Sequence, residues 1–363
     1  MQSSAYLCVI DFSSHSTVAA VQGGDIAQVA VIGASGYSGA ELLRILARHP
    51  RVEVALACAN ASAGEEIATI HPDLRGIVGG RFSPVDLNAA GSCDVVLLAL
   101  PAGESMKLVP DLLASGVRVV DLAGDFRFRD AAEYEAAYGR THAAPDLLAE
   151  AVYGLVEWDR ERIAGARLVA SPGCYPTATL LPLLPLLRAG LIEPMGITVA
   201  AMSGTTGAGR SGSAAFSMSE MGGNARPYRV GNHQHVPEIL QAVGRFAGIP
   251  AEITFVPHLL PVPRGILATA TATPAPGVDA AALQRALVDA YGSEPFVRVL
   301  DDALPELRSV VGTSWIEMAV RVDGSSGRAV LLSAIDNLRK GAASQAVQSM
   351  NIMLGYPETL GLL

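Results

Sequence analysis

The sequence predicts an α/β domain with a parallel sheet, followed by an α+β domain with a mixed or antiparallel sheet. Three observations predict this. Near the start, an apolar strand runs into a glycine-rich turn and a helix. Buried strands then alternate with helical segments. Beyond Cys174 the segments become longer strands rich in Val, Ile and Thr, separated by Gly/Pro loops. The length of 363 residues also favours two domains over one.

The first domain opens with the strand Gln28–Ile32 and continues, after the turn, as the helix Ala40–Ala47. Strand, glycine-rich turn and helix are the entry to the Rossmann dinucleotide-binding fold. Glycines let the backbone approach a pyrophosphate, whose charge then meets the N-terminus of the helix. We predict that the cofactor contacts Gly33, Ala34, Ser35, Gly36, Tyr37, Ser38 and Gly39.

The later elements follow from apolar runs and their spacing. In the first domain we expect strands at Val52–Cys58, Asp94–Leu100, Val117–Leu122 and Arg167–Ala170, with a helix at Met106–Ala114. In the second we expect strands at Ile197–Met202, Ile253–His258, Gly265–Thr273, Ser314–Val322 and Ala329–Ile335, with a helix at Ala280–Tyr291. The last helix, Asn337–Leu354, should fold back onto the first domain.

The predicted Rossmann domain therefore comprises residues 28–173 and 337–363, and the predicted catalytic domain comprises residues 174–336. Residues 1–27 match neither a secretory signal nor an Arg-rich transit peptide. We expect them to form a dispensable extension. The alternative is an ordered extra strand at Tyr6–Phe12.

The end of the second strand bears on the choice between NAD and NADP. NAD sites usually place an Asp or Glu there, where it binds the ribose hydroxyls. Here the segment 58–64 has no carboxylate before Glu65, and Asn60 and Ser62 can donate to a 2′-phosphate. That segment has no arginine either. The pattern favours NADP(H).

Charge and cysteine content exclude several classes of protein. The net charge of -9 disfavours nucleic acid or an anionic membrane as a partner. Four cysteines without close pairing predict neither a disulfide framework nor a zinc site. No apolar run reaches the roughly 18 residues that span a bilayer. We expect a reduced, cytoplasmic enzyme with a small-molecule substrate and no metal.

Cys174 is the candidate nucleophile. It lies in the Pro/Gly turn 171–177, which follows a short strand and precedes a leucine-rich helix. A thiol at a helix N-terminus should have a lowered pKa, as a nucleophile requires. The alternative is a buried structural cysteine, which is what we expect of Cys58 and Cys93.

Two histidines, His233 and His235, are candidates for proton transfer, because imidazole gives and takes protons near neutral pH. Chemistry alone does not choose between them. His258, at the end of an apolar strand, is a rival base. The alternatives are metal ligation by the pair, for which further ligands are missing nearby, or a solvated loop.

Other polar residues are candidates for binding. The glycine-rich loop 203–210, with Gly207 and Arg210, can brace the nicotinamide or hold a phosphoryl group; it can also be a surface hairpin. Arginine binds carboxylates through two hydrogen bonds. The candidates for the substrate carboxylate are Arg226, Tyr228 and Arg264. Asn337 is expected to contact the nicotinamide end, or else to cap a helix.

Several motifs occur in an order that carries a family resemblance. They are Gly-Ala-Ser-Gly-Tyr-Ser-Gly-Ala-Glu-Leu-Leu from Gly33, Asp-Leu-Ala-Gly-Asp-Phe-Arg from Asp121, Ser-Pro-Gly-Cys-Tyr-Pro-Thr-Ala-Thr from Ser171, His-Gln-His-Val-Pro-Glu from His233, Pro-Arg-Gly-Ile-Leu from Pro263 and Ala-Ile-Asp-Asn-Leu-Arg-Lys-Gly-Ala-Ala from Ala334. From about Gln28 to Leu363 the chain resembles the N-acetyl-gamma-glutamyl-phosphate reductases of the aspartate-semialdehyde dehydrogenase superfamily.

The resemblance implies a Rossmann domain, a dimerising catalytic α+β domain, NADPH and a thioester on Cys174, in arginine biosynthesis. It also implies His233 as acid/base, His235 and Glu238 at the substrate, and a homodimer or homotetramer. The reaction would reduce N-acetyl-L-glutamyl 5-phosphate to the 5-semialdehyde and phosphate. Two departures stand out: the family usually has His at Ala102, and an Arg or Ser pair near Asn60 is missing.

Three alternatives remain open. An aminoadipyl-phosphate reductase of lysine biosynthesis and an aspartate-semialdehyde dehydrogenase share this chemistry. A non-catalytic NADP-binding sensor would predict loss of the cysteine or the histidines, and both are present.

Overall fold

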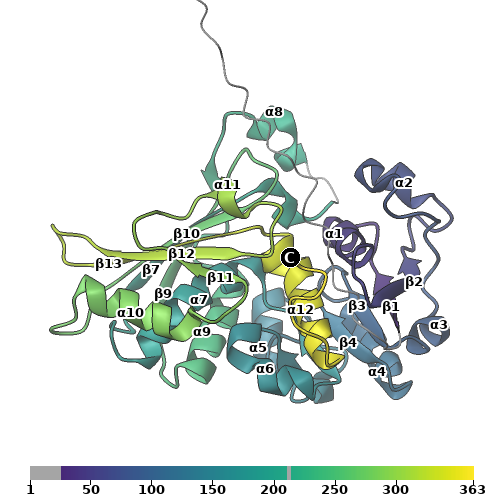
Figure 1. The fold of residues 1–363 in the computed structure, drawn as a ribbon, viewed down its shortest axis with the longest axis horizontal. Helices are drawn as coiled ribbons and strands as arrows, with labels where there is room; N and C mark the ends of the chain where they lie inside the picture. The colour runs from purple at the N-terminus through teal and green to yellow at the C-terminus, as the bar shows by residue number, and fades with distance from the viewer. Residues whose placement is uncertain (1–25, 211–213) are drawn as a thin grey trace, which may run out of the picture.

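The computed structural model describes residues 26–210 and 214–363, which form two sheets with their helices (Figure 1). The alternative strand Tyr6–Phe12 and nearly all of the predicted extension lie outside the described residues. The first sheet has the order β2-β1-β3-β4-β6-β5, and each of its pairings is parallel. Its strands are β1 (Ala27–Ile32), β2 (Val52–Cys58), β3 (Val95–Leu98), β4 (Arg118–Asp121), β5 (Val152–Tyr153) and β6 (Leu168–Ala170).

The order of this sheet reverses at β1, which is flanked by β2 and β3. In open α/β sheets, ligands bind at the carboxyl ends of the strands at such a switch point. The accompanying helices are α1 (Tyr37–Leu46), α2 (Ile67–Ile70), η1 (Pro72–Leu74), α3 (Leu87–Gly91), α4 (Ser105–Ala114), α5 (Ala131–Tyr138), η2 (Pro145–Leu147) and α6 (Val156–Ala164). Separate hydrophobic cores cover the two faces, so the central strands are apolar throughout.

The second sheet is mixed, with the order β11-β12-β13-β10-β7-β9-β8. Its strands are β7 (Ile197–Ser203), β8 (Arg226–Pro227), β9 (Ile253–Leu259), β10 (Ile266–Ala272), β11 (Val297–Val299), β12 (Ile316–Val322) and β13 (Ala329–Ile335). Its helices are α7 (Cys174–Arg188), η3 (Thr205–Ala208), η4 (Ala214–Phe216), α8 (Met218–Met221), α9 (His235–Phe246), α10 (Ala280–Tyr291) and α11 (Leu307–Val310).

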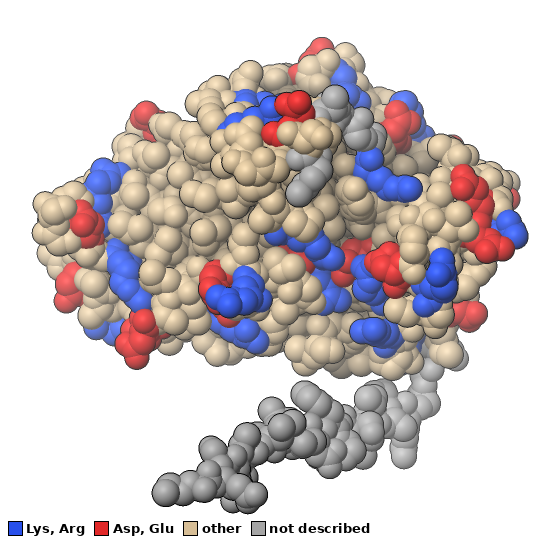
Figure 2. Space-filling view, turned by 90° about the horizontal axis from the view of Figure 1, so that it is seen from above, with Lys and Arg blue, Asp and Glu red and all other residues tan. Residues whose placement is uncertain are grey.

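Helices α7, α9 and α10 pack on one face of the second sheet (Figure 1). On the other face, alternate residues of β7, β9 and β10 stay partly exposed. Viewed from above, the half of the molecule that holds this sheet carries few charged side chains over its centre (Figure 2). This face is therefore open and largely uncharged.

The chain ends by returning to the first sheet. After β13 comes a π-helical turn, η5 (Arg339–Ala343), and then α12 (Ser344–Met353). The apolar side chains of α12 share a core with Val29 and Val31 of β1, and α12 packs against α6 (Figure 1). The predicted return of the last helix to the first domain is thus seen in the structure.

The predicted fold class is confirmed. Three predicted elements match to the residue: β2, β13 and α10. Two helices begin earlier than predicted, α1 at Tyr37 and α7 at Cys174 itself. The sequence reading passed over the short strands β5, β8 and β11 and the helices α5, α6 and α9. Two- and three-residue strands carry too few residues for a periodic signal.

Candidate active site

The glycine-rich turn between β1 and α1 has two positions at which only glycine fits. Gly33 has φ +88°, and a Cβ there would lie 2.3 Å from the carbonyl oxygen of Ala99. A Cβ on Gly39 would lie 2.4 Å from the carbonyl oxygen of Gly33. Gly36, the N-cap of α1, has more room, and no side chain caps the helix. The first N–H groups of α1 thus lack a side-chain acceptor, which suits a pyrophosphate at this turn.

The loop after β2 gains an arginine from elsewhere in the chain. Arg81 donates from Nη1 to the carbonyl oxygen of Gly64 at 2.8 Å and pairs through Nη2 with Glu66 at 2.7 Å. Asn60 in the same loop accepts the backbone N–H of Val85 through Oδ1 at 3.2 Å, which leaves its Nδ2 donors outside this bond. The sequence reading missed Arg81 because it follows the loop by 17 residues.

Cys174 is the first residue of α7, and Gly173 is its N-cap, without a side-chain cap. Cys174 is half-buried and, like Cys58 and Cys93, is not in a disulfide. Burial raises the pKa of the Cys174 thiol to about 11, although Arg127 and nearby backbone N–H groups lower it. The predicted lowering of the pKa is therefore wrong: desolvation outweighs the helix N-terminus. Attack by the sulfur then needs a base to take the thiol proton.

Glu238 lies directly behind the cysteine turn. Its Oε1 accepts the backbone N–H of Gly173 and the hydroxyl of Tyr153, each at 2.8 Å, and its Oε2 lies 3.3 Å from Nη1 of Arg127. The carboxylate is fully buried. We predicted Glu238 at the substrate, whereas protein donors already surround it.

Arg127 is the functional candidate that the sequence reading did not single out, although it closes the motif that begins at Asp121. Its guanidinium is buried and donates to the carbonyl oxygens of Ser171 and Leu122, both at 2.8 Å. Nη1 lies 3.5 Å from Nε2 of His235. The Arg127 guanidinium therefore contacts the segment after β4, the cysteine turn and α9.

The two predicted histidines contact the residues that flank Cys174: His235 lies against Gly173, and His233 packs on Tyr175. Nε2 of His235 is 2.5 Å from the position of a Cβ on Gly173, so only glycine fits there. The ring of His233 packs edge-on to Tyr175 at a centroid distance of 5.5 Å and to Tyr228 at 5.6 Å. The backbone N–H of His235 donates to Nδ1 of His233 at 3.2 Å.

Both imidazoles are neutral at pH 7. Burial, with the neighbouring His235 and Arg229, lowers the pKa of His233 to about 3. Burial and Arg127 hold the pKa of His235 well below its usual value. A neutral imidazole accepts protons, so either ring can serve as a base. The rival His258 is joined to the same cluster, since its carbonyl oxygen accepts the Tyr175 hydroxyl at 3.5 Å.

The predicted substrate residues Tyr228, Arg226 and Arg210 do not all lie at the tyrosine and histidine cluster. Tyr228 is at the site, because its hydroxyl donates to that of Tyr175 at 3.0 Å. Arg226 donates to the carbonyl oxygen of Ala215 at 2.8 Å, and Arg210 reaches the glycine-rich turn, where it donates to Ser35 at 3.1 Å.

Arg264 and Asn337 hold the junction between the two sheets. Arg264 pairs with Asp336 at 2.9 Å and with Glu41 of α1 at 3.0 Å, so its guanidinium is already engaged. Asn337 accepts the N–H of Gly265 at 2.7 Å and donates to Thr206 of η3 at 3.0 Å. That contact fixes the loop that carries the predicted cofactor residue Gly207, which is exposed.

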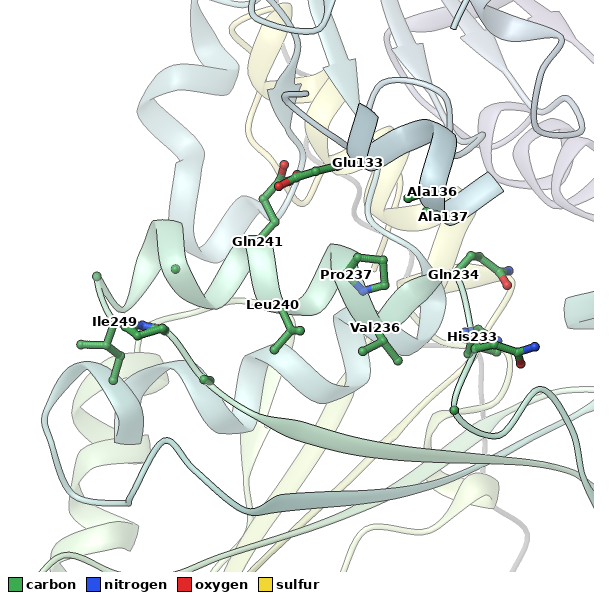
Figure 3. Close-up of a pocket in the computed structure, with 16 residues that line it drawn as sticks. Glu133, Ala136, Ala137, His233, Gln234, Val236, Pro237, Leu240, Gln241 and Ile249 are labelled. Carbon is green, nitrogen blue, oxygen red and sulfur yellow. The ribbon is translucent and has the colours of Figure 1, made fainter. Parts of the chain in front are cut away.

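A groove of about 860 Å³ runs along the outer side of α9, between α5 and the loop before α9. His233 and Gln234 lie at one end and Ile249 at the other, with Val236, Pro237 and Leu240 along it (Figure 3). Cys174 does not line it. His233 therefore borders both the tyrosine cluster and an open groove.

Among the described residues, no helix is long and apolar enough to cross a membrane. The same residues hold no group of three His, Cys, Asp or Glu side chains placed to bind a metal ion.

Both halves of the chain match families of known proteins. Residues 28–166 match the family model for the semialdehyde dehydrogenase NAD binding domain, and residues 174–337 match that for the semialdehyde dehydrogenase dimerisation domain. The fold is shared with aspartate semialdehyde dehydrogenase II from Vibrio cholerae, with a TM-score of 0.70 and 19% identity over 92% of this chain and 99% of that one. The protein is therefore an enzyme of the semialdehyde dehydrogenase class.

Closer relatives specify the family. N-acetyl-gamma-glutamyl-phosphate reductase from Alkalilimnicola ehrlichii is 48% identical over 92% of this chain and 97% of its own. The same enzyme from Azotobacter vinelandii is also 48% identical, with the same coverage of each chain. The chain belongs to the N-acetyl-gamma-glutamyl-phosphate reductase family, as the resemblance of its motifs predicted.

Proposed function

We propose that this protein reduces N-acetyl-L-glutamyl 5-phosphate to N-acetyl-L-glutamate 5-semialdehyde and phosphate, with NADPH as reductant, in arginine biosynthesis. The observation that carries this proposal is the placement of Cys174 at the start of α7. His235 lies against the preceding residue, Gly173, and His233 packs against the following residue, Tyr175. Relatives of this activity at 48% identity support the substrate. The aminoadipyl and aspartyl alternatives have no comparable support.

In the first step, Sγ of Cys174 attacks the acyl carbon while a neutral imidazole takes the thiol proton. Phosphate leaves, and a thioester remains. Developing oxyanions need N–H donors that are not already bonded. The N–H of Gly173 is bonded to Glu238, whereas those of Cys174 and Tyr175 face the sulfur. We assign oxyanion stabilisation to this first turn of α7, beyond Gly173.

In the second step, the reduced nicotinamide, when bound, supplies the hydride that converts the thioester into a thiohemiacetal. The imidazolium formed in the first step gives its proton to the alkoxide that hydride addition leaves, which completes the thiohemiacetal hydroxyl. His233 takes this proton while the C–S bond breaks and passes it to the departing sulfur, which releases the aldehyde and restores the cysteine thiol. Since His233 borders the groove along α9, the groove gives this buried ring a path for proton exchange with water.

The residues present fit NADP(H). The glycine-rich turn and the uncapped start of α1 suit the pyrophosphate. We assign the 2′-phosphate to Arg81 together with Asn60 and Ser62, because an arginine near the end of the second strand is the usual feature of NADP sites. Asn337 and Gly207 are assigned to the nicotinamide end, and Arg210 to the phosphoryl group.

The open face of the second sheet is the proposed interface of a homodimer or homotetramer. It is weakly charged and belongs to the segment that matches a dimerisation domain (Figure 2). Light scattering should give twice or four times the mass of the chain. The cytoplasmic location remains a prediction.

One set of assays tests the proposed function. Phosphate-dependent oxidation of N-acetyl-glutamate semialdehyde and reduction of N-acetyl-glutamyl, aspartyl and aminoadipyl phosphates should show a preference for the N-acetyl-glutamyl compounds. C174S should abolish turnover and leave the Kd for NADP+ unchanged. Preference for another acyl phosphate, or near-normal turnover by C174S, would overturn the proposal.

A further inference from the structure

The turn that joins β13 to α12 is π-helical, not α-helical. The N–H of Gly341 donates to the carbonyl oxygen of Asp336 at 3.0 Å, and that of Ala343 to Leu338 at 2.9 Å, each five residues back. Single π turns are rare and cost hydrogen-bond geometry, so they persist where packing demands them. Here the packing partner is the start of α7.

Gly341 lies directly against the proposed nucleophile. A Cβ on Gly341 would be 2.8 Å from the Cβ of Cys174 and 3.2 Å from Cδ1 of Ile335. The shorter contact is with the atom that carries Sγ, and that atom is fixed to the backbone of α7. Any side chain at 341 must therefore move either the turn or the cysteine.

A buried ion pair holds the turn. The residue before Gly341, Lys340, is fully buried, and its Nζ lies 2.5 Å from Oε1 of Glu157 on α6 and 3.0 Å from Oε1 of Gln348 on α12. Its ammonium also lies 5.8 Å from the centroid of the Phe296 ring. Losing one partner would leave an uncompensated charge in the interior, so the pair resists displacement of the turn.

We propose that Gly341 is a positioning residue for Cys174, and that the Lys340–Glu157 pair holds it in place. Because Gly341 has no side chain, η5 can seat against the cysteine Cβ and fix the direction of Sγ relative to the N–H groups of α7. The inference rests on the proposed role of Cys174 as nucleophile. The reacting sulfur is thus positioned from the C-terminal segment, nearly half the chain away.

The direct test is G341A, measured by steady-state kinetics and by alkylation of Cys174 with iodoacetamide across pH, with the labelled residue assigned by peptide mass spectrometry. We expect kcat to fall about 100-fold, as for misplacement of a reacting group by about 1 Å. The KM for the acyl phosphate and the Kd for NADP+ should stay within about twofold. The alkylation profile should shift to higher pH, because Sγ leaves its N–H donors.

The control is G165A, at the exposed end of α6, where an added Cβ meets no atom within 4 Å. It should alkylate and turn over as the wild type does. The double variant K340M/E157Q removes both charges of the pair and should shift the profile in the same direction as G341A. Its control is K107M, which breaks the exposed ion pair with Glu104.

Wild-type alkylation and kcat in folded G341A would overturn the proposal. If G341A fails to fold and the double variant behaves as wild type, the proposal is also overturned, because the turn then serves only the fold. Alkylation needs no turnover. It therefore tests the positioning of Cys174 even if the assigned substrate is wrong, a failure that the acyl phosphate assays report separately.

Discussion

The carboxylate of Glu238 accepts the backbone N–H of Gly173 at 2.8 Å, so a residue of α9 holds the turn that presents Cys174. The same oxygen accepts the Tyr153 hydroxyl, and Arg127 lies beside the other. A buried acid is expensive unless donors surround it. Here those donors come from the strand β5, the cysteine turn and the segment after β4. The arrangement makes Glu238 a structural centre of the site.

Replacement of Glu238 by Gln should therefore destabilise the protein. The variant leaves the guanidinium of Arg127 buried without its counter-ion, which costs about 3 kcal/mol or more. Y153F removes one neutral donor and should cost about 1 kcal/mol. Urea unfolding gives both values. Equal losses of unfolding free energy in the two variants would argue against the Arg127–Glu238 ion pair as the main contribution of Glu238 to stability.

Replacing each histidine in turn distinguishes the residue that transfers the proton from the residue that binds the substrate. H233N should lower kcat by about 100-fold or more, as expected when a general base is removed. Its residual rate should rise with pH as hydroxide replaces the imidazole. H235N should mainly raise the KM for the acyl phosphate, and H258N should have little effect. The pH–rate profiles of the three variants decide, and an exchange of the first two phenotypes would make His235 the base.

Replacement of Arg81 tests cofactor choice. A charge-assisted bond to phosphate contributes about 1.5–3 kcal/mol, so R81A should weaken NADP+ and 2′,5′-ADP binding by about 10- to 100-fold. Binding of NAD+ and 5′-AMP should not change, because they lack the 2′-phosphate. Calorimetry measures all four ligands. The control is R118A, at the opposite end of the sheet, and an equal loss for NAD+ would show a general role for Arg81.

The buried carboxyl of Asp121 should make stability depend on pH. Burial and the neighbouring Asp125 raise its pKa to about 7 from 3.8. Between these values the unfolded chain is ionised while the folded protein keeps the proton, so stability falls as pH rises from about 4 to 7. D121N cannot ionise and should lack this fall.

The size of that difference is roughly 4 kcal/mol for a group whose pKa rises from 3.8 to about 7. Denaturant melts of the wild type and D121N at several pH values measure it. D146N, at an exposed position in η2, is the matched control and should follow the wild type. Parallel curves for wild type and D121N would show that Asp121 ionises normally in the folded protein.

Local pattern determined the parts of this protein whose signal lies within a few neighbouring residues. The glycine-rich turn, the strands β2 and β13 and the helix α10 were predicted because periodicity and glycine spacing act over one element. The same holds for Cys174, whose Pro/Gly turn and following helix mark it among the cysteines. The motifs that led to the family are also short runs of neighbouring residues, so they could be recognised in the sequence.

Tertiary structure decided what depends on distant residues meeting. Arg81 reaches the loop at Asn60 only because segment 80–83 runs beside it, and Arg127 meets Glu238 only when α9 packs near β4. The pKa of Cys174 is raised and not lowered as predicted, because burial outweighs the effect of the helix N-terminus. No local sequence pattern reports burial. Gly341 against Cys174 is the extreme case: the contact exists only once the end of the chain has folded back onto α7.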